Sequence, residues 1–243
     1  MIPKIIHYCW LSGEKYPDKI RRCMDSWKRV LPDYEFWLWD KRQFDIESSI
    51  WVKEAVVHRK YAFAADYIRL YALYHFGGIY LDSDVKVLKG FDDLLELPYF
   101  VGKENSKHGI EAAVIGAEKG CEWIAQCLSY YENRHFVNPN RSFSMNVLPE
   151  VMANILAARY RFQDILSVRE FIYDEQVICR FPVDYFSPKS YVTKKIKITK
   201  NTRTIHHFAG TWQPWWKKIL LKLWVPLSVK YPVVTDRIKT FLK

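Results

Sequence analysis

The chain has 243 residues, of which 49% are hydrophobic, 16% aromatic and 26% charged, and its formal net charge is +10. Nine glycines, 11 prolines and no biased tract exclude a collagen, a disordered tail protein and a low-complexity array, because each of these needs a skewed composition. A single globular domain is expected, since about 200 to 250 residues in one unit is ordinary for α/β folds.

The amino-terminal part alternates predicted strands and helices. Residues 4–10 are rich in β-formers and end at a Leu-Ser-Gly turn. Residues 17–31 keep apolar positions at helical spacing and stop at Pro32, and residues 34–39 form a second aromatic strand. Strand, helix and strand with short joins predict the start of a parallel α/β sheet.

The next helix is predicted over 61–76, which is rich in alanine and leucine, lacks breakers and runs into Gly77-Gly78. A short buried strand at 79–81 follows, and Asp82 and Asp84 come where it ends. Later patterns predict strands at 99–103 and 112–115, helices at 121–131 and 147–158, and β-like runs at 195–199 and 203–205.

The positive charge is concentrated at the carboxyl-terminal end, where residues 186–243 hold thirteen basic residues and one acid. Within 215–224, tryptophan, isoleucine and leucine follow helical spacing while the lysines fall off that stripe. Such a helix either lies on an anionic membrane surface or packs on the core with a solvated basic side. We therefore divide the chain into a catalytic domain, 1–212, and a basic, tryptophan-rich tail, 213–243.

The cellular compartment is inferred from cysteine use and from missing targeting patterns. Five cysteines without a C-x-x-C pair indicate neither a disulfide framework nor a zinc ribbon, so a reducing cytosol fits best. The first ten residues do not resemble a signal peptide, and no stretch reaches the roughly 18 apolar residues of a membrane span. We expect a cytoplasmic protein, at most peripheral on the inner face of the cell membrane.

Asp82 and Asp84 are the sharpest chemical feature. Alternate residues at the end of a strand can turn toward one point and offer hard oxygen ligands to Mg²⁺ or Mn²⁺. Ligands of open parallel sheets bind at the carboxyl ends of strands, which favours a functional role. Without further context D-x-D is a weak signal, because it occurs by chance in many proteins and an Asx turn that caps the next segment is its ordinary explanation.

Three residues surround this motif in the sequence pattern. Asp66 and Arg69 share one face of the predicted helix that leads into the strand, and would suit the hydroxyls and phosphates of a nucleotide. A surface ion pair is the alternative for them. Trp10, at the end of the first strand, offers a stacking face for a base or is buried in the core.

A second signal is the pair His206-His207, followed by a small flexible loop and Trp212. One imidazole of the pair is a candidate to complete a metal site started by Asp84. The sequence leaves open which of the two histidines does so.

Together these segments resemble the nucleotide-sugar glycosyltransferases of the GT-A fold, and in particular glycosyltransferase family 32. The run from Ala65 to Leu70, with Leu73 and then Gly77 to Asp84, is similar to that family's signature. Residues 2–10 resemble its opening strand and 206–212 its closing motif. The resemblance implies an α/β, Rossmann-like fold with a central, mostly parallel sheet flanked by helices.

The resemblance also implies roles for individual residues. Asp84 would be the main carboxylate ligand of Mn²⁺ or Mg²⁺, assisted by Asp82, with His207 chosen as the third ligand and His206 as the alternative. The donor would be held by residues that contact its base, sugar or diphosphate, namely Trp10, Asp66, Arg69, Tyr80, Asp82 and Trp212. Glu111 and Asn146 are candidates for acceptor hydroxyls, in the region where the resemblance is weakest.

The implied reaction is retaining, metal-dependent transfer of a hexose from a nucleotide sugar to a saccharide hydroxyl. Breaking a glycosyl-phosphate bond leaves a diphosphate with extra negative charge, which a divalent ion stabilises, and no catalytic base is assigned. A uridine diphosphate hexose is the first expectation for the donor and guanosine diphosphate mannose the second. The missing membrane anchor and the tail favour a bacterial-type enzyme that acts on a lipid-linked acceptor in capsule or other cell-surface polysaccharide synthesis. No nucleic-acid partner is expected.

Three alternatives remain. A phosphatase of the haloacid dehalogenase type also uses D-x-D, but normally on its first strand and with Thr or Val where this chain has Lys86. A toxin-type glucosyltransferase that modifies proteins shares the same core motifs. A non-catalytic module that binds membrane or nucleic acid explains the basic tail but leaves the block from Asp66 to Asp84 unexplained.

Overall fold

The computed structural model describes residues 1–104, 109–191 and 193–210. Trp212 and the predicted tail helix lie outside these residues. The strands are β1 Ile5–Cys9, β2 Glu35–Trp39, β3 Gly78–Leu81, β4 Val85–Val87, β5 Tyr99–Val101, β6 Val114–Ala117, β7 Arg161–Asp164, β8 Val177–Arg180 and β9 Thr204–His206. The α-helices are α1 Asp18–Val30, α2 Ile50–Val57, α3 Tyr61–Phe76, α4 Glu122–Ser129, α5 Leu148–Ala157 and α6 Val183–Phe186.

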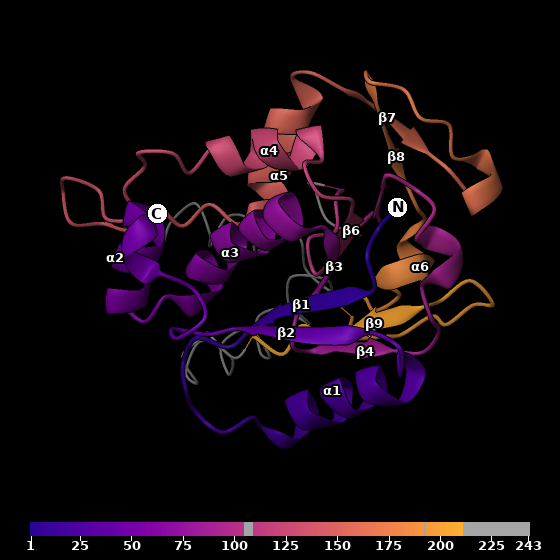
Figure 1. Ribbon diagram of the computed structural model, residues 1–243, viewed down its shortest axis with the longest axis horizontal. Helices are drawn as coiled ribbons and strands as arrows, with labels where there is room; N and C mark the ends of the chain where they lie inside the picture. Colours follow the sequence, from indigo (N-terminus) through magenta and orange to yellow (C-terminus); the bar gives the residue numbers. More distant parts are fainter. Residues whose placement is uncertain (105–108, 192, 211–243) are drawn as a thin grey trace, which may run out of the picture.

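A five-stranded sheet in the order β2-β1-β3-β6-β5 forms the centre of the molecule. β1 pairs in parallel with both β2 and β3, whereas β6 runs antiparallel to β3 and to β5. In Figure 1, α1 lies on one side of β1 and β2, and α3, α4 and α5 lie on the other. The predicted α/β class, with a central sheet flanked by helices, is confirmed.

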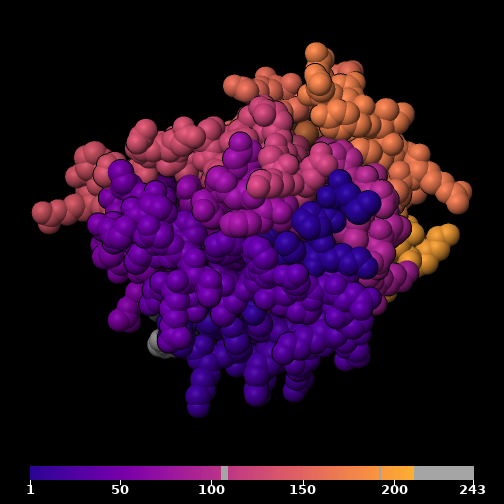
Figure 2. Space-filling view, in the orientation of Figure 1, coloured from indigo at the N-terminus to yellow at the C-terminus, as the bar shows by residue number. Residues whose placement is uncertain are grey.

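Two apolar clusters pack on the two faces of this sheet. Tyr80 belongs to the cluster formed with α2 to α5, while its neighbours Ile79 and Leu81 belong to the cluster beneath α1. This alternation follows the two-residue period of a strand, and it shows that β3 is buried on both faces. The surface reflects the chain order, because the indigo and purple N-terminal part covers the lower half of Figure 2 and the orange 160–185 segment stands at its upper edge.

The helix α3 has the bounds that the sequence predicts, because nothing interrupts the run until Gly77. Gly77 has φ +67° and its N–H donates to the Leu73 carbonyl, which ends the helix. Gly78 then enters β3 with φ +107°, where an added Cβ would lie 2.8 Å from the Ile5 carbonyl oxygen. Glycine is required there by both backbone conformation and close packing.

The strand β4, which the sequence analysis did not predict, is attached to α1 by two buried hydrogen bonds. Trp27 Nε1–H donates to the Val85 carbonyl at 2.7 Å, and the Val87 N–H donates to Ser26 Oγ at 2.9 Å. β4 in turn pairs antiparallel with β9, so that Val85 lies opposite His206. A three-residue pairing thus brings a late segment of the chain to the end of β3.

Other differences from the sequence predictions are local. α2, capped by the Ser49 hydroxyl, was not predicted, nor was the parallel pair of β7 and β8. Residues 195–199 were expected to be β-like but contribute only the isolated bridge between Lys189 and Ile196. Among the helices of the described residues, none is long and apolar enough to cross a membrane.

Candidate functional site

The site is assembled where β3 ends, beside the buried face of α3. Asp82 and Asp84 follow β3 in a tight turn, in which the Val85 N–H donates to the Asp82 carbonyl at 2.9 Å. The Asp82 N–H is held by the Ala113 carbonyl, also at 2.9 Å. The short turn keeps both carboxylates at one end of the sheet, as the sequence predicts.

Arg69 ties α3 to this turn. Its Nη2 lies 3.0 Å from Asp66 Oδ1 and 3.1 Å from Asp82 Oδ1. Its Nη1 donates to the carbonyl of Ala112, and its guanidinium lies over the Tyr80 ring at 4.5 Å. The predicted pairing of Asp66 with Arg69 is therefore present, but it is a buried network rather than a surface ion pair, because the Arg69 side chain is only 6% exposed.

Burial and charge act in opposite directions on these carboxylates. Burial raises the pKa of Asp66 to about 6, although Arg69 and the Leu148 N–H favour its charged form. Burial also raises the pKa of Asp82, again against the attraction of Arg69. Asp82 is the most exposed of the three aspartates, with 27% of its side chain exposed against 12% for Asp66 and for Asp84.

His206 completes the cluster from β9. Its Nε2 lies 3.5 Å from Asp84 Oδ1 and 3.9 Å from Asp82 Oδ2, and its Nδ1 lies 3.5 Å from Glu111 Oε1. Burial would lower the pKa of this imidazole, but the three carboxylates outweigh burial and raise the pKa to about 9.

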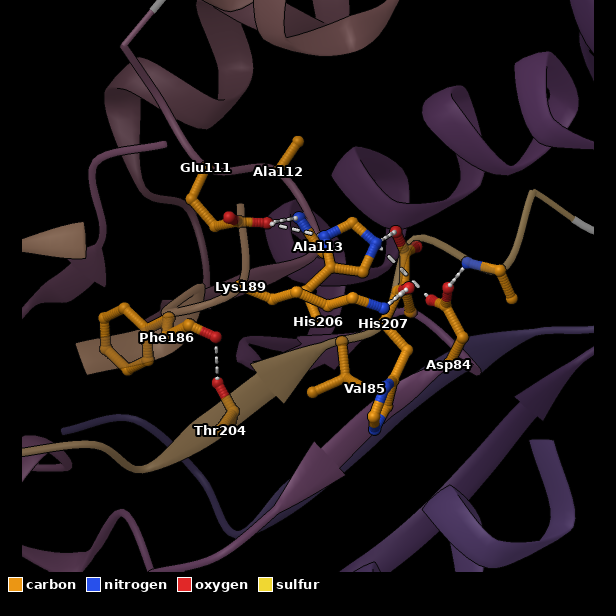
Figure 3. A network of polar contacts seen from close by, with 12 residues as sticks. Asp84, Val85, Glu111, Ala112, Ala113, Phe186, Lys189, Thr204, His206 and His207 are labelled. Carbon is orange, nitrogen blue, oxygen red and sulfur yellow. Dashed lines mark hydrogen bonds and ion pairs between the residues drawn. The ribbon is translucent and has the colours of Figure 1, made fainter. Parts of the chain in front are cut away.

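The prediction of His207 as third metal ligand is corrected, because the structure puts His206 beside the two carboxylates. Adjacent side chains at the end of β9 point to opposite sides, and Figure 3 shows the His207 ring directed away from the cluster, toward Val85. Burial and the nearby Lys19 and Lys189 lower the pKa of His207 to about 4. Its backbone still serves the site, since its N–H donates to the Asp84 carbonyl at 3.2 Å.

The donor atoms fit a divalent ion. Within the described ranges, Asp82, Asp84 and His206 form the group whose ligand atoms could share a metal, and one atom of each lies within 4.8 Å of the others. The Ala209 N–H donates to Asp84 Oδ2 at 2.6 Å, which fixes this carboxylate and leaves Oδ1 directed at His206. Two carboxylates and one imidazole suit Mn²⁺ or Mg²⁺.

Glu111 does not have the role predicted for it. Its side chain is 1% exposed and lies behind His206, so it cannot reach an acceptor hydroxyl. Burial would raise its pKa, but His206 and the Ala113 N–H lower it. Figure 3 shows one oxygen of this carboxylate facing both the His206 ring and the backbone nitrogen of Ala113.

Tyr80 is corrected in the same way, because it is 1% exposed and lies in the core under Arg69 instead of lining a nucleotide site. Trp10 is partly buried; its ring packs at 4.9 Å from Tyr16 and its Nε1–H donates to the Glu14 carbonyl. It follows β1, the parallel neighbour of β3, so its stacking role stays a prediction. Asn146 is exposed two residues before α5 and also stays a prediction.

The sequence analysis missed the contributions of backbone groups and of one lysine. The Ala112 carbonyl, which binds Arg69, and the Ala209 N–H, which binds Asp84, carry no signal in residue type. Lys189 Nζ donates to the His207 carbonyl at 2.6 Å and so braces the end of β9. Only the positive charge of Lys189 was visible in the sequence.

Comparison with known proteins identifies the region that carries this site. Residues 17–101 match the family described as glycosyltransferase sugar-binding region containing DXD motif. The match spans Asp66, Arg69, Asp82 and Asp84, so it supports the predicted sugar-binding D-x-D region at these residues. In the structure the D-x-D motif follows β3 and not the first strand, which disfavours the phosphatase alternative.

The similar curated proteins include fungal enzymes, whereas the sequence analysis expected an enzyme of bacterial capsule synthesis. The chain is 36% identical over 129 residues to inositol phosphoceramide mannosyltransferase 3 of Schizosaccharomyces pombe, covering 51% of this chain and 36% of that protein. It is 32% identical over 124 residues to a mannosyl phosphorylinositol ceramide synthase of Saccharomyces cerevisiae, covering 48% of this chain and 31% of that protein. The chain thus spans about a third of the length of these two relatives.

Comparison with solved structures gives the PaToxG glycosyltransferase, which is 22% identical with a TM-score of 0.49 and covers 65% of this chain and 68% of that chain. The glycosyltransferase GlyE of Streptococcus pneumoniae is 13% identical with a TM-score of 0.44 and covers 94% of this chain and 64% of that chain.

Proposed function

We propose that this protein is a retaining, metal-dependent glycosyltransferase that moves a hexose from a nucleotide sugar to a hydroxyl of a lipid-borne acceptor. The observation that carries the proposal is the convergence of Asp82, Asp84 and His206 at the end of β3. This convergence lies at the D-x-D motif of the matched sugar-binding region.

The residues around this point have distinct tasks in the proposed reaction. Asp84 and His206 would hold a divalent ion, with Asp82 beside it at the solvent-exposed edge. When bound, such an ion supplies positive charge that offsets the charge developing on the departing diphosphate. Arg69 forms ion pairs with Asp82 and Asp66, so both carboxylates are already oriented when the donor binds.

The relatives refine the substrate part of the proposal. Their names describe mannosyl transfer to a phosphoinositol-bearing ceramide. We therefore rank mannose from guanosine diphosphate mannose ahead of a uridine diphosphate hexose, which reverses the order expected from the sequence. The lipid-borne acceptor gains support from these names, whereas capsule or other surface-polysaccharide synthesis does not.

The membrane part of the proposal rests on sequence alone. A cytoplasmic enzyme that meets its acceptor at an anionic membrane surface would use the basic, tryptophan-rich segment 213–243 for that contact. Vesicle sedimentation of the whole protein, with and without anionic lipid, tests this contact. Equal binding to neutral and anionic vesicles would contradict it.

The central experiment measures thermal unfolding against a panel of nucleoside diphosphates and nucleotide sugars, with and without Mn²⁺. A ligand that binds only the folded protein at a hundredfold excess over Kd stabilises it by about 2.7 kcal/mol. We expect one nucleotide to raise the midpoint only in the presence of Mn²⁺. The base of that nucleotide then identifies the donor.

Two variants make the test specific. Asp84→Asn keeps an oxygen for the Ala209 N–H but removes the charge that faces His206, so the metal-dependent shift should disappear. Asp18→Asn removes an exposed carboxylate on α1 and should leave the shift unchanged. No shift in the wild type, or a shift that survives in Asp84→Asn, would contradict the proposed function.

A further inference from the structure

We propose that Glu111 is a positioning residue that orients the His206 imidazole toward the metal. This inference rests on the proposed function, since it assumes that His206 binds the ion. Glu111 lies in the segment before β6, on the opposite side of the imidazole from Asp82 and Asp84. The sequence suggested an acceptor-binding role, which its burial excludes.

Backbone hydrogen bonds hold Glu111 in place independently of His206. The Glu111 N–H donates to the Gly102 carbonyl at 2.8 Å, which fixes the backbone of this residue. Its Oε1 accepts a hydrogen bond of 2.8 Å from the Ala113 N–H, only two residues further along. The carboxylate is thus held by its own loop and does not depend on His206 for its orientation.

The two edges of the His206 ring face different partners. Nδ1 lies 3.5 Å from Glu111 Oε1; it is buried and makes no hydrogen bond among the described residues, so this carboxylate is the acceptor placed to receive its proton. Nε2 lies on the other side, facing Asp84 and Asp82. A carboxylate only accepts hydrogen bonds, so in the neutral imidazole the proton belongs on Nδ1 and the lone pair of Nε2 faces the metal position.

This arrangement is typical of metal-binding histidines, in which the ring nitrogen that does not bind the metal donates a hydrogen bond to a protein acceptor. A metal-ligating imidazole usually donates its other N–H to a carboxylate or a carbonyl, and loss of that partner costs about 10-fold to 100-fold in metal affinity. The Nδ1 to Oε1 distance is at the long limit for a hydrogen bond. We expect it to shorten when Nε2 carries a ligand.

Two substitutions separate the orientation of the ring from the charge behind it. Glu111→Gln loses the charge but keeps the length, so its carbonyl oxygen can still accept from both the Ala113 N–H and His206 Nδ1. Glu111→Asp keeps the charge but is one methylene shorter, and cannot hold both contacts. Neither variant creates a large cavity or removes all polar atoms, so both should fold.

The experiment is the affinity of the purified protein for Mn²⁺ alone, measured by the loss of the free-ion signal in electron paramagnetic resonance at fixed pH. We expect Glu111→Asp to weaken binding about 10-fold to 100-fold and Glu111→Gln to stay closer to the wild type. Wild-type affinity in Glu111→Asp, or weaker binding in Glu111→Gln than in Glu111→Asp, would overturn the positioning role.

The Mn²⁺ affinity of Asp84→Asn tests separately whether the metal site exists. If the wild type binds Mn²⁺ no better than Asp84→Asn does, the proposed function fails, and the role of Glu111 fails with it. If Asp84→Asn weakens binding while Glu111→Asp does not, the proposed function stands and only the role of Glu111 is refuted.

Discussion

The loss of Arg69 provides the most direct test of the buried charge network. Arg69→Met keeps an unbranched apolar stem in place of the arginine but removes the guanidinium, and with it two ion pairs, at 3.0 Å to Asp66 and 3.1 Å to Asp82. It also loses the hydrogen bond to the Ala112 carbonyl. Two carboxylates are then left beside an apolar group in a region that is largely shielded from water.

The expected cost follows from that burial. Removing one partner of a buried ion pair destabilises a protein by about 3–5 kcal/mol, because an uncompensated charge remains. For a chain of this size each kcal/mol lowers Tm by about 2–4 °C, so Tm should fall by about 6–20 °C. The free energy of unfolding at constant temperature, from urea denaturation, is the matching quantity.

The pH dependence of this loss is a second diagnostic. Without Arg69, the pKa values of Asp66 and Asp82 rise further above those in the unfolded chain, since Arg69 is the strongest of the influences that lower them. The folded variant then binds more protons than its unfolded form, so its stability falls as pH rises through that window. The deficit relative to the wild type should be smaller at pH 5 than at pH 8.

The control is Arg21→Met, which breaks an exposed pair with Asp18 on α1. Exposed pairs contribute about 0–1 kcal/mol, so this variant should unfold close to the wild type. If Arg69→Met costs no more than Arg21→Met, or if its deficit does not change with pH, the network does not stabilise the fold as described.

Two further predictions concern the core of the sheet. His7 is buried, with Nε2 donating to the Gly77 carbonyl and Nδ1 accepting from Trp39, and burial lowers its pKa to about 4. In the unfolded chain the pKa of this histidine is about 6.5. Keeping the ring neutral therefore stabilises the fold fully above about pH 6.5, and about 3 kcal/mol of that stability is lost as the pH falls from about 6.5 to 4. Urea midpoints of His7→Gln should therefore fall less steeply over this range, and parallel curves would refute the reasoning. Gly78→Ala should lower the free energy of unfolding by about 2–3 kcal/mol, because the new Cβ meets the Ile5 carbonyl. The control Gly120→Ala has φ +78° but open space around it, so it should lose only about 1 kcal/mol. Equal losses in urea denaturation would contradict the packing argument.

Local sequence was sufficient where local forces decide the structure. α3 has its predicted bounds because an uninterrupted helical run meets a glycine that can adopt positive φ. The turn holding Asp82 and Asp84 was predicted because a short apolar strand ends there. The pairing of Asp66 with Arg69 follows from their spacing of three residues on one helix.

Tertiary pairing decided what the sequence could not. His206 and His207 are adjacent, and only the register of β9 against β4 determines which ring faces the carboxylates. Glu111 is polar in sequence, but its burial depends on the loop before β6 folding behind that ring. β4 itself is too short to be recognised without its partner strand.

If the chain binds a metal ion as proposed, the pairing of β4 with β9 links that binding to the order in which the chain is completed. Asp84 is synthesised early, but its histidine partner arrives only after the segments that build β5 to β8 have left the ribosome. A nascent chain or a proteolytic fragment that stops before β9 would have two carboxylates and no imidazole. An ion that binds only the folded form stabilises it, and here it would hold β9 against the turn after β3. Removal of the ion by a chelator should therefore make β9 accessible to proteases before the rest of the domain.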